Sequence, residues 1–172
     1  MFEMSMFGEL TYFLGLQVKQ TDLGIYINQA KYARNLVKRF GLDNAAHART
    51  PMATNVKLIN DPSGESIDIT LYRNMIGCLL YLTTSRPDIA FSVGVCSRSR
   101  SNPKVSHLNA VKRIIKYVAG TCDYRLFYSK ESNLSLIGFS DFGWAGNADD
   151  RKSTIGRCFY VGANPVAWMS KK

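Results

Sequence analysis

The chain has 172 residues, of which 46% are hydrophobic, so it is long and apolar enough for one ordinary domain or two small ones with packed cores. Lysine and arginine total 22 against 13 aspartate and glutamate, and the net charge of +9 favours polyanionic partners such as nucleic acid or an anionic membrane surface. No run of about 18 apolar residues occurs, which excludes a membrane-spanning helix in this sequence.

The first residues and the cysteines indicate the compartment. The opening MFEMSMFGEL carries two glutamates and lacks a basic region followed by an apolar one, so a secretory signal is not expected. We expect a cytoplasmic location with no membrane partner, where the cysteines are free core thiols. They are far apart and form no Cys-x-x-Cys pair, which argues against a zinc site. The four are Cys78, Cys96, Cys122 and Cys158.

Two β-rich runs come first in the chain, at residues 10–20 and 24–28. Both are rich in aromatic and branched residues, which are typical of strands. Gly24 is able to adopt a positive φ after the short linker between them. The pair therefore predicts a β-hairpin.

A basic amphipathic helix is predicted directly after the hairpin. Asn28 stands at an N-cap position, and the apolar residues that follow keep the 3.6-residue helical period to about Phe40, before Gly41. Cations share a separate face of this helix. They are Lys31, Arg34 and Lys38.

The next stretch changes character. Residues 43–69 contain two prolines, one glycine and many short polar side chains, which predict a long loop or linker. A buried helix is expected at residues 71–83, because apolar residues recur there at helical spacing. Its apolar face consists of Tyr72, Met75, Ile76, Leu79 and Leu80.

Two further helices are predicted. Pro87 and Asp88 mark a helix start, because a first-turn proline has no N–H to satisfy and an early aspartate favours the positive end of the helix dipole. That helix should run over residues 87–97, and another over residues 104–119. The second has a basic face that either contacts phosphates or is merely solvated, and the salt dependence of binding separates these alternatives. This face consists of Lys112, Arg113 and Lys116.

The pattern changes from helices to strands near residues 120–123, so we expect an α+β fold with antiparallel strands at both ends. Asp141 lies at a strand end, where an aspartate serves either a turn or a metal site. A metal-dependent nuclease requires several carboxylates, and the sequence shows no obvious partners for this one. It also shows no phosphate-cradling glycine loop. The predicted strands are residues 124–128, 135–141, 156–161 and 165–169.

The sequence motifs, taken as ordered strings, identify a family more specifically than the spacing of individual residues does. The chain contains, in order, FEMSMFGELTYFLGLQVKQ, GIYINQAKYARNLVKRFGL, TPMATN, YRNMIGCLLYLTTSRPDIAFSVGVCSR, HLNAVKRIIKYVAGT and SDFGWAGNADDRKSTIGRCFYVGANPVAWMSKK. These strings resemble the Pol polyprotein of plant copia-type LTR retrotransposons. The resemblance covers essentially the whole chain.

The resemblance implies three segments. Residues 1–60 look like the end of the reverse transcriptase palm and the thumb with a linker, and residues 61–122 look like the helical thumb-to-connection segment. Residues 123–172 look like the start of ribonuclease H, with an incomplete antiparallel sheet. The early hairpin matches the primer-holding hairpin of the family, and the basic helix faces would lie along the backbone of an RNA–DNA hybrid. Asp141 matches the first metal-binding aspartate of ribonuclease H.

Several positions depart from the family pattern. The Tyr-x-Asp-Asp polymerase turn does not occur in the chain. The remaining ribonuclease H carboxylates belong beyond Lys172, and Gly143 stands where the family usually has a second aspartate. Ser99 and Arg100 replace an aromatic residue and an amide. Asp141 therefore lacks the partners that would hold two magnesium ions, the metal of the parent enzyme, and we expect no cofactor for the fragment.

Two hypotheses follow. In the first, the chain is a truncated, catalytically inactive piece of reverse transcriptase and ribonuclease H that keeps a weak affinity for an RNA–DNA hybrid or other nucleic acid. Such a piece could also self-associate through its unfinished sheet. Alternatively, it is a repurposed module that binds a protein or RNA partner. The missing carboxylates disfavour an active polymerase or nuclease.

Overall fold

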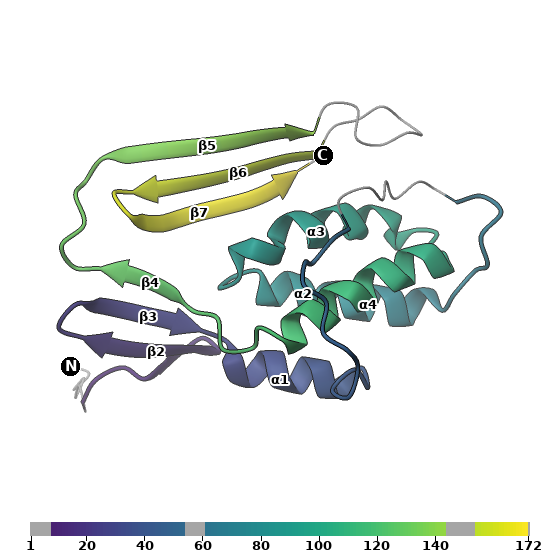
Figure 1. Ribbon diagram of the computed structural model, residues 1–172, viewed down its shortest axis with the longest axis horizontal. Coiled ribbons are helices and arrows are strands. Elements are labelled where there is room, and N and C mark those ends of the chain that lie inside the picture. The colour runs from purple at the N-terminus through teal and green to yellow at the C-terminus, as the bar shows by residue number, and fades with distance from the viewer. Residues whose placement is uncertain (1–7, 54–60, 144–153, 172) are drawn as a thin grey trace, which may run out of the picture.

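Figure 1 shows a layer of helices beside two antiparallel sheets. The structure is a computed structural model that describes residues 8–53, 61–143 and 154–171. Its mixed α+β class is the one that the sequence predicts. The first elements are β1 (Tyr12–Phe13), β2 (Leu16–Thr21), β3 (Gly24–Asn28), α1 (Ala30–Arg39) and α2 (Ile69–Leu82). The later elements are α3 (Pro87–Ser97), η1 (Arg98–Arg100), α4 (Val105–Ala119), β4 (Leu126–Ser129), β5 (Leu136–Gly143), β6 (Thr154–Val161) and β7 (Asn164–Lys171).

The first sheet has the strand order β1-β2-β3-β4, with antiparallel pairing throughout. The predicted run over residues 10–20 is two strands, because the backbone turns at Leu14 and Gly15, whose φ values are 48° and 81°. A Cβ atom at Gly15 would collide with the hydroxyl of Tyr81. That hydroxyl donates a hydrogen bond to the Leu14 carbonyl at 3.2 Å, so the turn is anchored on α2.

The neighbours of β4 differ from the prediction. Residues 124–128 were expected to begin the C-terminal sheet, but β4 pairs with β3, placing Ile27 opposite Leu126. Leu126 is buried in this pairing, with 9% of its surface exposed. Burial of this apolar side chain is the physical reason for the arrangement. The prediction that this strand belongs to an incomplete C-terminal sheet is therefore wrong. The division of the chain into three segments stays a prediction.

The ends of α1 lie close to the predicted positions. Gln29 is the N-cap residue, one position after the predicted Asn28. The Asn28 side chain still serves the helix start, because its Oδ1 accepts a hydrogen bond from the Ala30 N–H at 3.0 Å. Gly41, with φ of 64°, follows the helix end as predicted.

Helix α2 begins two residues before the predicted start. Asp68, which was assigned to the loop, caps it by accepting hydrogen bonds from the N–H groups of Thr70 and Leu71 at 2.7 and 3.3 Å. The buried face also differs from the prediction at one position. Leu80 is 39% exposed, while Leu82 is buried.

The core lies between the four α-helices of the described chain, and none of these helices combines the length and apolarity needed to cross a membrane. Helix α3 has the predicted bounds. One polar group inside the core is satisfied, because the Tyr72 hydroxyl donates to the Cys96 carbonyl at 2.7 Å. The largest fully buried side chains include Tyr72, Ile76, Leu79, Leu82, Ile89, Ile114 and Ile115.

The second sheet has the order β5-β6-β7, and β7 lies beside α3 (Figure 1). The Trp168 indole donates to the Thr83 carbonyl at the end of α2, at 2.7 Å. Asn164 joins the two sheets, because its side chain accepts from the Ser129 N–H at 2.7 Å and donates to the Ser129 carbonyl at 3.2 Å. The sheet is thus attached to the helices and to β4.

All four cysteines are free thiols, as predicted, but only Cys96 is fully buried. Burial raises the pKa of its thiol to about 12. Burial also raises the pKa of the half-buried Cys122. Neither environment favours a reactive thiolate.

Candidate functional site

The first predicted basic face lies on α1. Lys31, Arg34 and Lys38 are all exposed. Arg34 forms an ion pair with Asp123, which follows α4. The two side chains are 57% and 77% exposed, so the pair contributes little stability, but it neutralises one of the three cations. The two lysines form no ion pair with a described residue.

The second predicted basic face lies on α4 and is partly covered. The Arg113 guanidinium donates to the carbonyl and the hydroxyl of Thr50 at 3.2 and 2.9 Å. The Ala48 N–H donates to the Lys116 carbonyl at 3.4 Å, so this part of the loop lies along the helix. Lys112 is exposed and Lys116 is half-buried. The Arg113 guanidinium is therefore occupied by hydrogen bonds to Thr50. Lys112 is the most accessible cation of this face.

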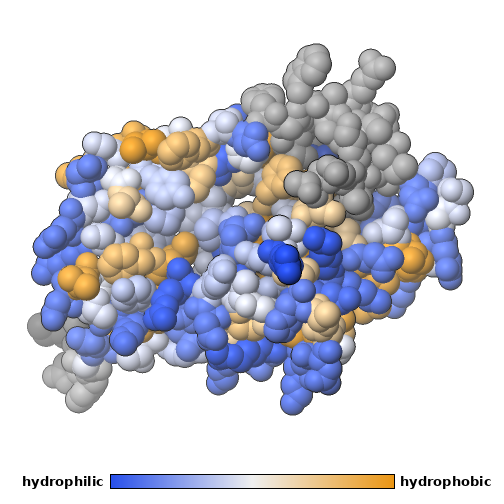
Figure 2. All heavy atoms as spheres, in the orientation of Figure 1, coloured by the Kyte–Doolittle hydropathy of each residue, from blue (hydrophilic) through white to orange (hydrophobic). Residues whose placement is uncertain are grey.

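Helices α1 and α4 pack against each other, which brings the two basic faces onto neighbouring elements. Figure 2 shows many hydrophilic residues over the lower part of the molecule, where these helices lie in Figure 1. The exposed lysines among the predicted residues are Lys31, Lys38 and Lys112. Cations on an exposed surface suit phosphate contacts, which fix position without reading sequence.

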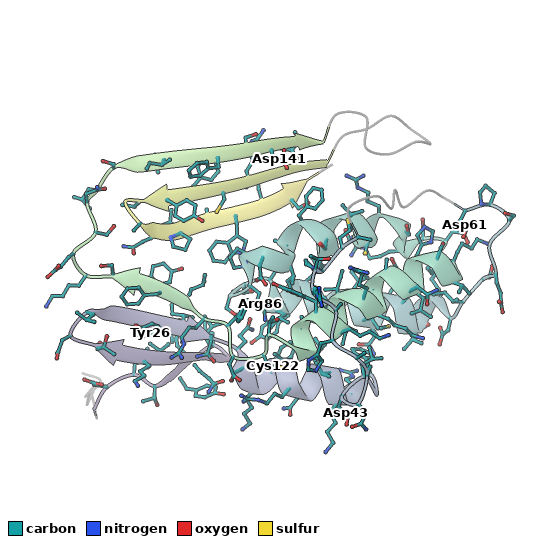
Figure 3. The ribbon with its side chains drawn as sticks, in the orientation of Figure 1. Tyr26, Asp43, Asp61, Arg86, Cys122 and Asp141 are labelled. Carbon is teal, nitrogen blue, oxygen red and sulfur yellow. The ribbon has the colours of Figure 1, made fainter. Side chains whose placement is uncertain are left out.

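Asp141 lies on β5, where Figure 3 labels it, and its side chain is exposed. It stands opposite Gly156 of β6. An open groove of about 440 Å³ passes beside it, between this part of the sheet and α3. The charged groups in the lining are Asp141 and Arg157, and the rest is mainly apolar, with Pro87, Ala90, Phe91, Phe139, Trp168 and Met169.

Arg86 is the most heavily bonded buried cation described, and its role was not predicted. Figure 3 shows it between the strands and the helices, and only 3% of it is exposed. Its guanidinium donates to Asp88 at 2.9 and 2.7 Å, and to the Thr121 carbonyl and hydroxyl at 2.9 and 2.7 Å. Burial alone would lower the pKa of Arg86, but the hydrogen bond and charge of Asp88 raise it overall. The only sequence signal was an arginine two residues before an aspartate.

Comparison with known proteins identifies the family. The retrovirus-related Pol polyproteins from transposons RE2 and RE1 of Arabidopsis thaliana are each 40% identical to the chain over 164 residues, which is 95% of this chain. The uncharacterized mitochondrial protein AtMg00810 of the same plant is 33% identical over 172 residues, covering 99% of this chain and 71% of that protein. The chain belongs to the Pol polyprotein family of copia-type retrotransposons.

This Pol-family chain spans 11% of the length of the RE2 and RE1 polyproteins. A comparison with protein-family models gives no match. No solved structure matches the chain either. The predicted family resemblance is thus confirmed by curated sequences alone.

Magnesium is the metal that the Pol family implies, and the described residues do not fit a site for it. Two-metal hydrolysis requires several oxygen ligands around the ions. Across residues 8–53, 61–143 and 154–171, no three His, Cys, Asp or Glu side chains are grouped so that they could hold a metal. Asp141 shares its groove with the cationic Arg157, and Asp149 and Asp150 lie outside the described residues. We assign no catalytic step to this part of the Pol-family chain.

Proposed function

We propose that the chain is a segment of a retrotransposon Pol polyprotein that joins the end of reverse transcriptase to the start of ribonuclease H. The similarity to Pol polyproteins over 95% of the chain carries this proposal. In the parent, the segment would serve RNA-directed DNA synthesis with magnesium. Alone, it binds nucleic acid weakly and catalyses no reaction, because Asp141 belongs to no group of three or more potential metal ligands among the described residues.

The exposed cations of α1 and α4 supply the binding. Lys31, Lys38 and Lys112 are accessible and lie on two helices that pack together. Each phosphate that a lysine neutralises releases counterions, so binding should weaken as salt increases. The net charge of +9 adds a general attraction for nucleic acid.

Binding to an RNA–DNA hybrid should depend strongly on salt between about 50 and 200 mM. Lys38→Gln and Lys112→Gln should each reduce the slope of log affinity against log salt by about 0.9, the expected loss of one phosphate contact. Arg157→Gln is the matched control, because Arg157 is exposed on β6, away from both helices. Fluorescence anisotropy of a labelled hybrid measures all slopes. A flat salt dependence of the unmodified chain would exclude the phosphate contacts.

Catalytic inactivity has a separate test within the same proposal. The purified chain is incubated with magnesium and either a labelled RNA–DNA hybrid or a primed template with deoxynucleotides. We expect neither cleavage nor extension. Activity that disappears in Asp141→Asn would contradict the proposal directly.

Self-association through the second sheet is a further part of the proposal. Among the described strands, β5 pairs only with β6, so its other edge carries unpaired backbone groups. Leu136 and Phe139 on this strand are 73% and 60% exposed. An edge of this kind is able to pair with the same edge of a second copy.

Light scattering should therefore show association that increases with protein concentration. Leu136→Lys should reduce it, because a charge on an edge strand opposes strand pairing. Leu23→Lys is the control, since Leu23 is 70% exposed in the turn of the first sheet. Equal association of the two variants would show that β5 is not the contact.

A further inference from the structure

A groove runs along the edge of β7, apart from the basic faces of α1 and α4. Among the described strands β7 pairs only with β6, so the backbone groups on its other edge are not used by the sheet. Figure 1 shows β7 as the strand of the second sheet that lies nearest to the helices. The groove lies between this strand and the helices, is open to solvent and has a volume of about 460 Å³.

The groove has a strand as one wall and two helices as the other. Five consecutive residues of β7, 166–170, line it, together with the end of α2 and one side of α3. Successive residues of a strand point to alternate faces of a sheet, so a wall that includes all five of them is the edge of the strand. The α3 side consists of the small residues Ala90, Gly94 and Ser97, which recur at helical spacing. None of the described residues in the lining is charged.

The strand is held in place beside the groove. The Trp168 indole donates to the Thr83 carbonyl at 2.7 Å, which fixes the middle of β7 over the end of α2. The Ser170 hydroxyl lies against Gly94, where a Cβ atom would collide with it. The edge of β7 is therefore preformed, and a ligand need not order it on binding.

Extended backbone already meets this edge where β7 begins. The Asn164 side chain accepts a hydrogen bond from the Ser129 N–H at 2.7 Å and donates to the Ser129 carbonyl at 3.2 Å. The amide thus binds the backbone of β4 in the way that a neighbouring strand would. No described strand continues this pairing beyond Asn164, so residues 166–170 offer the same edge without an occupant.

We propose that this groove binds an extended peptide of a partner protein, which adds to β7 as a further strand of the second sheet. Backbone hydrogen bonds to the edge hold the peptide, and its uncharged side chains lie at alternate positions against α2 and α3. At about 3.3 Å per residue, the five strand residues match a peptide of about five residues. Nucleic acid does not suit the groove, because the described lining has no cation to neutralise a phosphate.

The test uses the full chain and the fluorescein-labelled peptide Lys-Thr-Val-Thr-Val-Thr-Lys, whose lysines give solubility. Its fluorescence anisotropy should increase on binding. The same peptide with an N-methyl group on every internal residue keeps the side chains but loses the backbone donors, so it should bind at least about tenfold more weakly. Equal binding of the two peptides, or binding of neither, would overturn the proposal.

Substitutions on the two walls locate the binding. Val166→Lys places a charge on the β7 wall and should weaken peptide binding by about tenfold, and Thr84→Lys should do the same from the helical wall. Both residues are exposed, so both variants should fold, which thermal unfolding followed by circular dichroism checks. Ile137→Lys is the matched control, because Ile137 is 43% exposed on β5 of the same sheet, while Val166 is 50% exposed. An equal loss of binding in the control would contradict a site at β7.

Hydrogen exchange of backbone amides distinguishes an added strand from contact through side chains alone. The bound peptide should slow exchange within residues 166–170 and leave exchange in β5 unchanged. Peptide binding without this protection would show that the edge of β7 is not used, and the inference would be wrong.

Two further measurements separate this inference from the proposals above. A second copy of the chain is the other candidate occupant, and light scattering of Val166→Lys tests it. Loss of self-association in this variant, with no binding of the peptide, would assign the groove to a second copy and overturn the inference. Lys38→Gln should leave peptide affinity unchanged, and an excess of RNA–DNA hybrid should not displace the peptide. Displacement would contradict a separate peptide site, whereas peptide binding without any hybrid binding would refute the proposed function alone.

Discussion

Replacing Asp88 with alanine should destabilise the protein by about 3 kcal/mol, because it leaves the buried guanidinium of Arg86 without its counter-charge. Arg86 is 3% exposed, and two of its four hydrogen bonds end on the Asp88 carboxylate, at 2.9 and 2.7 Å. The two bonds to Thr121 remain but supply no negative charge. The expected cost is at the low end for a broken buried pair, since the Asp88 side chain is 31% exposed.

Urea unfolding of three variants measures this effect. Asp123→Ala is the matched control, because it also removes a carboxylate from an arginine, but the Arg34–Asp123 pair is exposed. The control should change the free energy of unfolding by at most about 1 kcal/mol. The double variant Arg86→Met with Asp88→Ala should recover part of the loss, since no buried charge is left. Equal unfolding midpoints for Asp88→Ala and Asp123→Ala would contradict the role of the buried pair.

The sequence predicts the location of α3 but not this network. Pro87 and Asp88 are local signals, so the helix start could be recognised from neighbouring residues alone. Thr121 lies 35 positions from Arg86 along the chain, and Tyr117 also donates to the Asp88 carboxylate at 3.0 Å. Partners that only the folded chain brings together leave no local pattern.

Strand pairing shows the same limit. Residues near Leu126 have the composition of a strand, and a strand is found there. Its partner is β3, which lies about a hundred residues earlier in the chain. Composition identifies a strand, whereas the choice of neighbour depends on which apolar face it buries. The stacking of the Tyr26 ring on the Phe127 ring, across β3 and β4, could not be predicted for this reason.

The accessibility of the candidate basic residues could be predicted only in part. Helical spacing correctly places Lys31, Arg34 and Lys38 on the exposed side of α1. Spacing cannot reveal that Asp123 pairs with Arg34, or that Thr50 binds Arg113. Accessibility of a charge depends on the loops that fold over a helix, and loop paths are not encoded in a periodic pattern.

Replacing Leu79 with alanine should destabilise the protein by about 2–5 kcal/mol, because it opens a cavity at the centre of the helical core. Leu79 has no exposed surface, and its neighbour Leu80 on the same helix is 39% exposed. The same substitution at Leu80 should therefore cost less than about 1 kcal/mol, although the apolar pattern assigned both leucines to the buried face. Thermal and urea unfolding of Leu79→Ala and Leu80→Ala give the comparison directly. Similar losses in both variants would mean that Leu80 is covered in solution, which would contradict its exposure on α2.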